Sequence, residues 1–541
     1  MVRDEIKKAI SEVIEEAQTE ELLLKFEVPE ITVERSGDEK YGDYASNIAL
    51  KISKLAKKSP NDVAQILERR LKEKILFAKV QIAPNGFINF FLLKEFLQEQ
   101  VHEILEEKDN YGGLDIGQGK KVQVEFISAN PTGPLTLGNA RGGFLGDTLA
   151  NILQKAGYVV QREFLINDAG YQIEVLGHSI LGDEKAQYNG GYIEELREKL
   201  KKFLDKPAGE IGFKAAQLIF ETMIKPVIEQ RMKIKFDNWF SEKAMRESGA
   251  IEKIIELLKE KKVVFENEGA LWFKSTDFGD DKDRVLITSE NSERGREATY
   301  ISQDIAYHYD KFIKRKFDKA IDIWAADHHG YVSRLQAAKK ALEMSGELTI
   351  IVMQLVKLFQ DGKEVRMSKR SGIYVTIEEL LDEIPLDVAR FFFLMYSPDT
   401  HMDFNLDLAR EQSEKNPVYY VQYAYARICS IFKKSDADIK KHINEADNLE
   451  LLNHPAELIL IKQLIRLPEI IEDIVKDYQV QRLPQYALDL VRAFHKFYEG
   501  CRVIDEKNQD LTKVRLVLVE STRIVLKNTL DLMGISAPEK M

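Results

Sequence analysis

The first 110 positions place hydrophobic residues with a helical spacing at the start and an alternating spacing later. One helical face of residues 1–17 collects Val2, Ile6, Ile10, Val13, Ile14 and Ala17. A second helix is predicted to begin at Ser59-Pro60, because serine caps helix N-termini and proline suits the first helical position. Strand-like segments follow, with a turn at Pro84-Asn85-Gly86. This pattern predicts a small α+β domain over residues 1–110.

Strands and helices alternate from residue 121 onward. The hydrophobic spacing predicts strands in 121–128, 319–330 and 346–360, and a helix in 144–156. Residues 175–295 are rich in Glu, Lys and Leu, and we interpret them as an inserted helical and mixed segment. Strands that alternate with helices favour a Rossmann-like parallel sheet, so residues 111–405 are predicted to form an α/β domain.

The strand pattern disappears after about residue 405. Four long segments with helical spacing follow, beginning with NPVYYVQYAYARICSIF and ending with LTKVRLVLVESTRIVLKNTLDLMG. We therefore predict an all-α helix bundle over residues 406–541.

Composition limits the possible classes of protein. The 541 residues are 44% hydrophobic and 31% charged, and they contain no uninterrupted apolar run long enough to span a membrane. The amphipathic, acidic N-terminus does not resemble a signal peptide. Cys429 and Cys501 lack metal-binding spacing, so we expect no zinc site and a cytoplasmic location. The net charge of −11 is a weak argument against nucleic-acid binding, which needs only a local basic face.

Polar residues cluster at the ends of the predicted strands 121–128 and 319–330, and at the end of the apolar stretch YVVQREFLIND (158–168). The clusters are FISAN (126–130), INDAG (166–170) and AADHH (325–329). Because ligands of parallel sheets bind at the carboxyl ends of the strands, these clusters predict one active site.

Two further segments sharpen this prediction. NPTGPLTLGNARGG (130–143) lies between a strand and a helix, as phosphate-binding turns do, and GKEVRMSKRSG (362–372) is a basic loop after the sheet. They resemble the two signatures of class I aminoacyl-tRNA synthetases, usually spelled HIGH and KMSKS. The strings YGDYASNIAL, PNGFINFFL, NPVYYVQYAYARI and MGISAPEKM resemble bacterial-type arginyl-tRNA synthetases from the first domain to the last residue.

The first signature departs from the family pattern. It reads Thr136-Leu137-Gly138-Asn139, so both histidines that donate hydrogen bonds to ATP phosphates are replaced. Asn139 retains an amide donor and Thr136 a hydroxyl donor. One alternative is therefore a tRNA-binding paralogue without activation chemistry, which Lys369 and Asp304 argue against. A cysteinyl-type synthetase is excluded because both cysteines lie in the C-terminal bundle.

The resemblance implies ATP-dependent formation of arginyl-adenylate, and then transfer of arginine to the 2′-hydroxyl of the terminal adenosine of tRNA(Arg). It implies Mg²⁺ with ATP and a monomer, and it implies that arginine activation waits for tRNA. Thr136, Gly138, Asn139, Lys369, Arg366 and Arg370 are the predicted catalytic residues. The predicted ATP-binding residues are Pro131, Gly133, Leu137, Asp327, His328, Met367 and Ser368. His328 is also compatible with a purely structural role.

Arginine needs a site for a planar cation, and a carboxylate can bind guanidinium in a bidentate manner. By resemblance Asp304 has this role, and Tyr300 lies one helical turn before it. The other predicted arginine-binding residues are Glu125, Ser128, Asn130 and Asn167, with Asp168 in support. An ordinary surface charge at Asp304 remains the alternative, as does structural packing at Asn167 and Asp168.

The family uses its N-terminal domain for the tRNA elbow and its C-terminal bundle for the anticodon. The predicted tRNA-binding residues are Asn47, Tyr420, Tyr423, Arg427 and Met541. Tyr419, Tyr420, Tyr423 and Tyr425 form an aromatic cluster on which unpaired bases can stack, although we expect at least two of them in the core.

Overall fold

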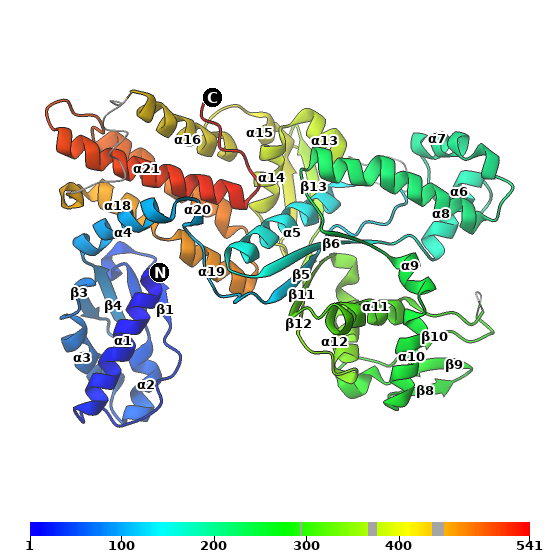
Figure 1. Cartoon of the computed structure of the whole chain (residues 1–541), viewed down its shortest axis with the longest axis horizontal. Coiled ribbons are helices and arrows are strands. Elements are labelled where there is room, and N and C mark those ends of the chain that lie inside the picture. The colour runs from blue at the N-terminus through cyan, green and yellow to red at the C-terminus, as the bar shows by residue number, and fades with distance from the viewer. Residues whose placement is uncertain (293–294, 366–375, 435–447) are drawn as a thin grey trace.

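The computed structural model describes residues 1–292, 295–365, 376–434 and 448–541, with the side chains of 327–329 excepted. Three regions follow one another along the chain (Figure 1). They are an N-terminal α+β domain, a parallel sheet with flanking helices, and a C-terminal helix bundle. The predicted fold class is confirmed.

The N-terminal domain is a four-stranded antiparallel sheet, in the order β1-β2-β4-β3, packed against helices. The buried face of the first helix is the one predicted, and Ser59 caps the third helix by accepting a hydrogen bond from the backbone N–H of Asp62. The elements are α1 (Val2–Thr19), β1 (Val33–Arg35), β2 (Tyr44–Ser46), α2 (Ile48–Ala56), α3 (Pro60–Leu71), β3 (Phe77–Ile82), β4 (Ile88–Leu92) and α4 (Lys94–Glu107).

The central region is built on a five-stranded parallel sheet in the order β12-β11-β5-β6-β7. Its elements are β5 (Lys121–Glu125), α5 (Leu137–Lys155), β6 (Val159–Ile166), β7 (Asn238–Ser241), α11 (Tyr300–Tyr309), β11 (Lys319–Ala325), α12 (Val332–Ala341) and β12 (Glu347–Met353). Between β6 and α11 lie α6 (Tyr171–Leu181), α7 (Gly191–Lys199), α8 (Ala208–Ile219), α9 (Glu242–Glu247), α10 (Ala250–Glu260), β8 (Val264–Asn267), β9 (Ala270–Phe273) and β10 (Arg284–Ile287).

A second, three-stranded sheet of order β14-β13-β15 follows the parallel one. Its elements, with the adjoining helices, are β13 (Val356–Gln360), β14 (Lys363–Val365), α13 (Ile377–Glu383), α14 (Leu386–Leu394), β15 (Met402–Asn405) and α15 (Leu406–Arg410). The single strand expected in 346–360 is therefore wrong. The chain leaves the parallel sheet at Gln354, whose backbone N–H donates to the Pro398 carbonyl, and then enters the second sheet.

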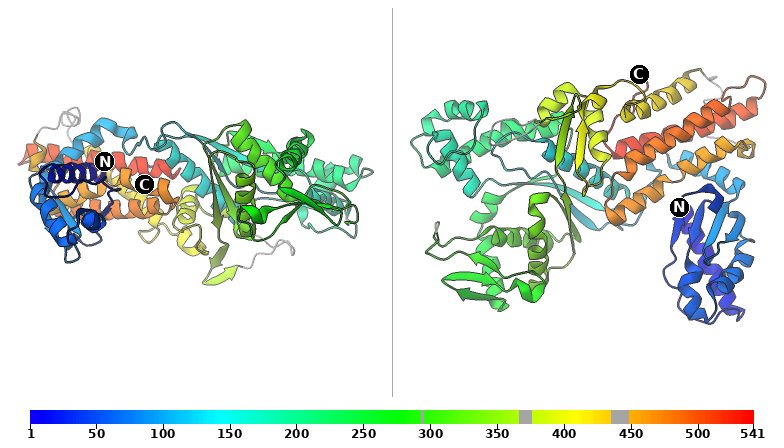
Figure 2. Two further views of the ribbon diagram at one scale, coloured as in Figure 1. Left: turned by 90° about the horizontal axis from the view of Figure 1, so that it is seen from below. Right: turned by 180° about the vertical axis from the view of Figure 1, so that it is seen from behind.

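The C-terminal region consists of α16 (Pro417–Lys434), α18 (Pro455–Leu464), α19 (Leu467–Asp477), α20 (Arg482–Gly500) and α21 (Gln509–Leu532). The N-terminal domain packs against this bundle and lies away from the parallel sheet (Figure 2). Arg3 of α1 joins the two, because its guanidinium contacts Glu472 at 2.9 Å and Asp473 at 2.7 Å. Among the described residues, no helix is both long and apolar enough to cross a membrane.

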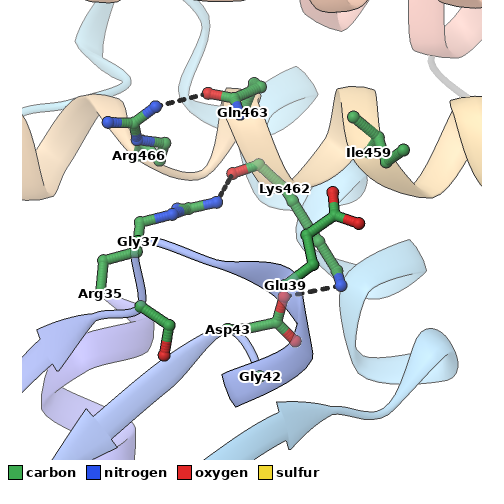
Figure 3. Close-up of a pocket in the computed structure, with 10 residues that line it drawn as sticks. Arg35, Gly37, Glu39, Gly42, Asp43, Ile459, Lys462, Gln463 and Arg466 are labelled. Carbon is green, nitrogen blue, oxygen red and sulfur yellow. Dashed lines mark hydrogen bonds and ion pairs between the residues drawn. The ribbon is translucent and has the colours of Figure 1, made fainter.

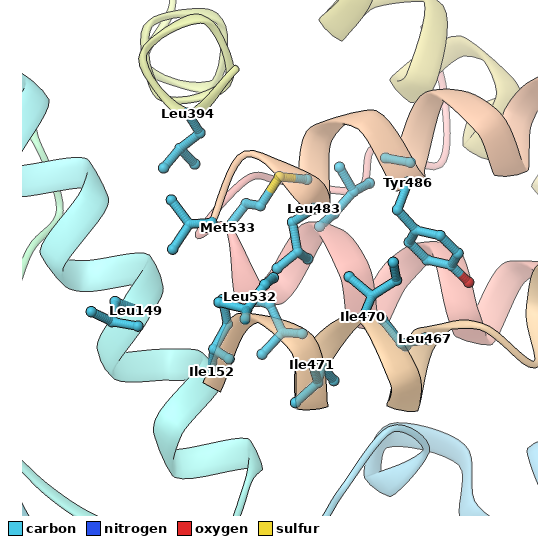
Figure 4. Close-up of a cluster of buried hydrophobic side chains, with 14 of the residues drawn as sticks. Leu149, Ile152, Leu394, Leu467, Ile470, Ile471, Leu483, Tyr486, Leu532 and Met533 are labelled. Carbon is cyan, nitrogen blue, oxygen red and sulfur yellow. The ribbon is translucent and has the colours of Figure 1, made fainter. Parts of the chain in front are cut away.

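Helix α5 connects the parallel sheet to the bundle. Its buried Leu149 and Ile152 meet apolar residues of α14, α19 and α21 in one hydrophobic cluster (Figure 4). Arg390 of α14 lies beside this cluster, almost fully buried, and donates to Asp147 of α5 at 2.8 Å and to the Met533 carbonyl at 3.1 Å. The bundle and the sheet therefore share a core.

Candidate active site

The order of strands in the parallel sheet defines where a ligand can bind. From β5 the chain proceeds to β6 and β7 on one side, and later to β11 and β12 on the other. The order reverses between β5 and β11, and in open α/β sheets the crevice outside the carboxyl ends at such a point holds the ligand. The predicted FISAN and AADHH clusters follow β5 and β11 directly.

The FISAN and INDAG clusters are hydrogen-bonded to each other. The Asn167 side chain donates to the Ser128 carbonyl at 3.0 Å. The Ser128 hydroxyl accepts from the Leu165 backbone N–H at 3.1 Å and donates to Glu125 at 3.0 Å. Ile127 and Ser128 have positive φ values of 66° and 37°, which are unfavourable for non-glycine residues. Backbone strain of this kind is concentrated at functional sites.

The Gly-rich turn ends at the N-terminus of α5. The helix begins at Leu137, so the expected start at 144 is wrong: Thr136 caps the helix, and the GNARGG sequence is already helical. Asn139 folds back over this end, and its Oδ1 accepts from the Thr136 backbone N–H at 3.0 Å and from the Thr136 hydroxyl at 2.9 Å. Because this oxygen is occupied, the Asn139 amide group is the donor left to face a ligand.

Gly138 leaves space at this helix end that the described residues do not fill. The residue is exposed, and a Cβ built there has only the Thr136 hydroxyl nearby, at 3.7 Å. At Gly146 on the same helix a Cβ lies 2.3 Å from the Phe126 ring, so packing against the sheet explains that glycine. Packing does not explain Gly138. Of the other predicted residues here, Pro131 and Leu137 are buried and Gly133 is half-buried.

The second signature falls outside the described residues. This applies to Arg366, Met367, Ser368, Lys369 and Arg370. The segment that follows it is joined to the first signature, since Thr376 forms a β-bridge with Thr136 and the Ile377 backbone N–H donates to the Leu135 carbonyl at 3.1 Å. Thr376 and Glu379 form a capping box at the start of α13. Asp327 and His328 lie in a short 3-10 helix directly after β11.

Helix α11 carries the two residues predicted to bind guanidinium. Tyr300 is its first residue and is half-exposed, and Asp304 follows one turn later. Within the described residues, no hydrogen bond or ion pair reaches the partly exposed Asp304 carboxylate. Burial raises the pKa of Asp304 to about 7; the charge of His308 opposes this shift, and the carboxylates of Glu242, Glu125 and Asp322 add to it. Asp304 thus has no cation bonded to its carboxylate in the described part of the chain.

Beneath Asp304 lies a group of buried charges that we call the polar floor: Glu125, His308, Lys311 and Asp322. The fully buried Lys311 ammonium contacts Glu125 at 2.6 Å and Asp322 at 2.7 Å. His308 faces Asp322 at 2.8 Å and the Asp304 carbonyl at 2.7 Å. Both imidazole nitrogens therefore lie within hydrogen-bond distance of an oxygen. The floor joins the Lys311 ammonium and the His308 ring to two buried carboxylates.

The floor shifts the pKa values of its members in ways that follow from these contacts. Burial raises the pKa of Glu125, and the ammonium of Lys311 opposes this. Burial also opposes ionisation of Asp322, but Lys311 and His308 outweigh it and lower the pKa of Asp322 to about 2. Since Glu125 is only 4% exposed and already holds Lys311, its contact with substrate is restricted.

The remaining predicted arginine-site residues also have protein partners. Asn130 donates to Gln172 at 2.6 Å, which ties the end of β5 to α6. Asp168 accepts from the Ser241 hydroxyl at 2.7 Å and from the Lys243 backbone N–H at 2.8 Å. Asp168 therefore holds the loop after β7 against the loop after β6.

Sequence analysis did not identify Lys311, His308, Asp322 or Gln172. One signal was present: Asp322 interrupts the apolar strand KAIDIW, and a charge inside a buried strand requires a partner. Its partner Lys311 lies in a π-helical turn, Asp310–Lys314, that continues α11. Such turns occur frequently at functional sites, but their positions do not follow from hydrophobic spacing.

The residues predicted to bind tRNA lie on the two outer domains. On α16, Tyr425 is buried and Tyr420 packs beside His495, whereas Tyr419 and Tyr423 stack on each other with ring centroids 6.4 Å apart. Arg427 lies over the Tyr498 ring at 4.5 Å, and Met541 is exposed. Asn47 is the N-cap residue of α2, and its buried side-chain oxygen has no partner among the residues that the structure describes.

The comparisons with known proteins cover the three regions of the fold. The family model for the arginyl tRNA synthetase N terminal domain matches residues 4–92. The model for the catalytic domain of tRNA synthetases class I (R) matches 100–391, and the DALR anticodon binding domain model matches 421–541.

Relatives match over the whole length of the chain. The arginine–tRNA ligase of Moorella thermoacetica is 44% identical over 536 residues, covering 95% of this chain and 94% of the relative. That of Shouchella clausii is 41% identical over 541 residues, covering 96% of both chains. The structure of Thermus thermophilus arginyl-tRNA synthetase is similar in fold, with a TM-score of 0.77 at 23% identity over 100% of both chains.

The parallel sheet, the capped turn at its carboxyl edge and the catalytic-domain match together define a class I aminoacyl-tRNA synthetase, a ligase that uses ATP. The N-terminal domain match and the full-length relatives narrow this class. The chain belongs to the arginyl-tRNA synthetase family.

Proposed function

We propose that this protein is an arginine–tRNA ligase and that the carboxyl edge of its parallel sheet carries out both steps of the reaction. The observation that carries this proposal is the partly exposed Asp304 carboxylate, which has no partner among the described residues. A guanidinium is the planar cation that a carboxylate binds in a bidentate manner, and Tyr300 lines the same helix face. This arrangement rejects lysine because a point charge cannot reproduce the two parallel hydrogen bonds.

In the first step, the arginine carboxylate attacks the α-phosphorus of ATP, which forms arginyl-adenylate and releases pyrophosphate. The N-terminus of α5 supports this step, because its free backbone N–H groups and dipole favour a phosphate. Gly138 gives the nucleotide access to this backbone, and the Asn139 amide donates where the family has histidines. The Thr136 hydroxyl joins it as a donor only when its hydrogen bond to Asn139 Oδ1 is released. Pro131, Gly133 and Leu137 hold the turn in shape.

Lys369, with Arg366 and Arg370, neutralises the departing pyrophosphate in this proposal. Met367 and Ser368 complete that loop, and Asp327 and His328 take the adenosine side after β11. Mg²⁺ would enter with ATP and would supply positive charge to its phosphates, which would reduce the charge that repels the nucleophile. Positioning and charge neutralisation are the main demands of phosphoryl-type chemistry, so no covalent intermediate with the protein is required.

In the second step, the 2′-hydroxyl of the terminal adenosine of tRNA(Arg) attacks the arginyl carbonyl, and AMP leaves. Ser128, Asn130 and Asn167 orient the amino-acid end of arginine above the polar floor. Glu125 contributes indirectly, because it accepts hydrogen bonds from Lys311 and Ser128 and so holds Ser128 in position. Asn47 and the α16 residues Tyr420, Tyr423 and Arg427, with Met541, contact the tRNA. We also propose a monomer in the cytoplasm, where the thiols of the buried Cys429 and Cys501 remain reduced.

The test is arginine-dependent exchange of pyrophosphate into ATP, measured with and without tRNA(Arg). Exchange that requires arginine and tRNA is the expected result. The competing function is a tRNA-binding protein without activation chemistry, which the replacement of both signature histidines by Thr136 and Asn139 favours. Intact tRNA binding with no exchange under either condition contradicts the ligase and supports this competitor.

A further inference from the structure

A pocket of about 440 Å³ lies between the N-terminal domain and the bundle (Figure 3). We call it the seam pocket. The loop joining β1 to β2 forms one wall, and the end of α18 with the start of α19 forms the other. Three cationic side chains line it: Arg35, Lys462 and Arg466.

The lysine in this pocket already has its counter-ion. The Lys462 ammonium contacts Asp43 at 2.6 Å, and the second Asp43 oxygen accepts from the Leu92 backbone N–H at 2.9 Å. The remaining acid, Glu39, is exposed at the wall. With three cations and two carboxylates on its walls, the pocket has a net positive charge.

The two arginines are incompletely paired. One Arg35 nitrogen, Nη2, donates to the Lys462 carbonyl at 2.9 Å, while Nη1 is buried and has no partner in the part of the chain that the structure describes. Arg466 donates to the neutral Gln463 side chain at 2.6 Å, and its nearest carboxylate, Asp489, is 3.9 Å away. Burial lowers the pKa of Arg466, and the positive charge of Arg35 lowers it further, so the two guanidinium groups repel each other.

Two guanidinium groups that repel each other in a half-enclosed space are stabilised by an anion between them. Guanidinium binds phosphate oxygens through parallel N–H···O bonds, and an unsatisfied buried donor is unfavourable until such a partner arrives. The geometry points to a phosphate-binding site between Arg35 and Arg466, and we propose that the seam pocket takes a phosphate group from an RNA backbone or from free phosphate. The RNA source rests on the proposed function, since it presumes tRNA as substrate.

The RNA arm of the test measures tRNA(Arg) affinity by filter binding across several salt concentrations. The full-length variant Arg466→Gln is compared with Arg69→Gln, which removes the same charge from an exposed position on α3 outside the pocket. Arg466→Gln is expected to weaken binding about 3- to 10-fold and to reduce the salt dependence by about one released ion, as the loss of one phosphate contact does. Arg69→Gln is expected to change neither quantity.

The free-phosphate arm measures the thermal unfolding midpoint without RNA, in chloride and in inorganic phosphate at equal ionic strength. The site is assigned to free phosphate if two results are obtained. Phosphate raises the unfolding midpoint of the wild type and of Arg69→Gln but not of Arg466→Gln, and tRNA(Arg) affinity is the same in all three proteins. In chloride, Arg466→Gln is expected to be at least as stable as the wild type, because the repulsion is removed. If it is less stable, Arg35→Lys repeats both arms, since lysine keeps the charge and loses the planar donor pair.

Equal effects of Arg466→Gln and Arg69→Gln on tRNA binding, together with no specific response to phosphate, overturn the proposal. Both arms measure binding, so a protein that binds tRNA but does not charge it still tests the seam pocket. If the wild-type protein binds no tRNA, only the proposed function is contradicted. The free-phosphate arm then shows whether the seam pocket binds phosphate.

Discussion

The polar floor and the seam pocket both hold charged side chains away from water, but only the floor is complete. In the floor, Lys311 lies between Glu125 and Asp322, and the His308 ring is hydrogen-bonded to Asp322. In the seam pocket, Arg466 has only a long ion pair of 3.9 Å with Asp489, and Arg35 Nη1 has no partner among the described residues. Asp304, which lies next to the floor, shows the opposite imbalance: it is a carboxylate without a bonded cation among the described residues. We infer from this difference that the paired charges of the floor stabilise the fold, whereas Asp304 and the two arginines of the seam pocket bind ligands.

Breaking the floor is expected to have the largest effect. In Lys311→Met two buried carboxylates lose their shared cation, and the free energy of unfolding is expected to fall by about 3–5 kcal/mol. Lys314→Met is the matched control, because Lys314 is exposed and its Asp310 partner is 3.6 Å away. We expect the control to change stability by less than about 0.5 kcal/mol in urea unfolding. Similar stabilities of the two variants would show that the floor is not a structural unit.

Removing a charge that has no bonded partner among the described residues is expected to affect ligand binding and to leave the fold intact. Asp304→Asn is expected to reduce kcat/KM for arginine by about 10²- to 10³-fold, roughly 3–4 kcal/mol, because a buried guanidinium loses its counter-ion. The KM for ATP is expected to stay within about twofold. Steady-state charging kinetics measure both. An equal loss for ATP, or a protein less stable than the wild type, would place Asp304 among the structural charges.

Two glycines of α5 show the same contrast between a residue that stabilises the fold and a residue that serves ligand binding, and here no charge is involved. Gly146→Ala forces a methyl group against Phe126, and we expect it to lower the free energy of unfolding by about 1–3 kcal/mol. Gly138→Ala meets no atom of the described residues closer than 3.7 Å, so we expect unchanged stability and a raised KM for ATP. Thermal unfolding and ATP titration of both variants provide the check. A destabilised Gly138→Ala would mean that packing selects this glycine too.

The smallest effect concerns pH. The pKa of Asp304 is raised to about 7, so below pH 7 the carboxyl is increasingly protonated and must lose its proton to bind guanidinium. Arginine affinity is expected to fall up to tenfold, about 1.4 kcal/mol, for each pH unit below 7. Without arginine the sign is reversed: a raised carboxyl pKa makes the fold lose stability as pH rises from about 4 to 7. Calorimetric titration of arginine from pH 5.5 to 8 tests this, with Asp304→Asn as the pH-insensitive control. A flat profile in the wild type contradicts the shift.

The sequence predicted the fold class because hydrophobic spacing records which face of each element is buried. It misplaced the start of α5, since GNARGG contains residues more typical of turns than of helices, and a cap at Thr136 overrides that preference. It also merged β12 and β13, because an uninterrupted apolar run does not reveal where a strand changes sheet.

The candidate site was predicted through local motifs, and its long-range contacts were not. The strand-end clusters were expected to meet, and the hydrogen bond from Asn167 to the Ser128 carbonyl joins two of them. The contact between Glu125 and Lys311 links residues 186 positions apart, and no spacing rule relates them. The seam pocket was not predicted for the same reason, since Arg35 and Arg466 come from different domains.

The shared core around α5 has a consequence for anyone who wishes to isolate the catalytic region. Ending the chain near residue 405 would expose Leu149 and Ile152 to water and deprive Arg390 of the Met533 carbonyl. The aminoacylation centre is therefore not a detachable module, and any minimal enzyme made from this chain must retain α19, α20 and α21.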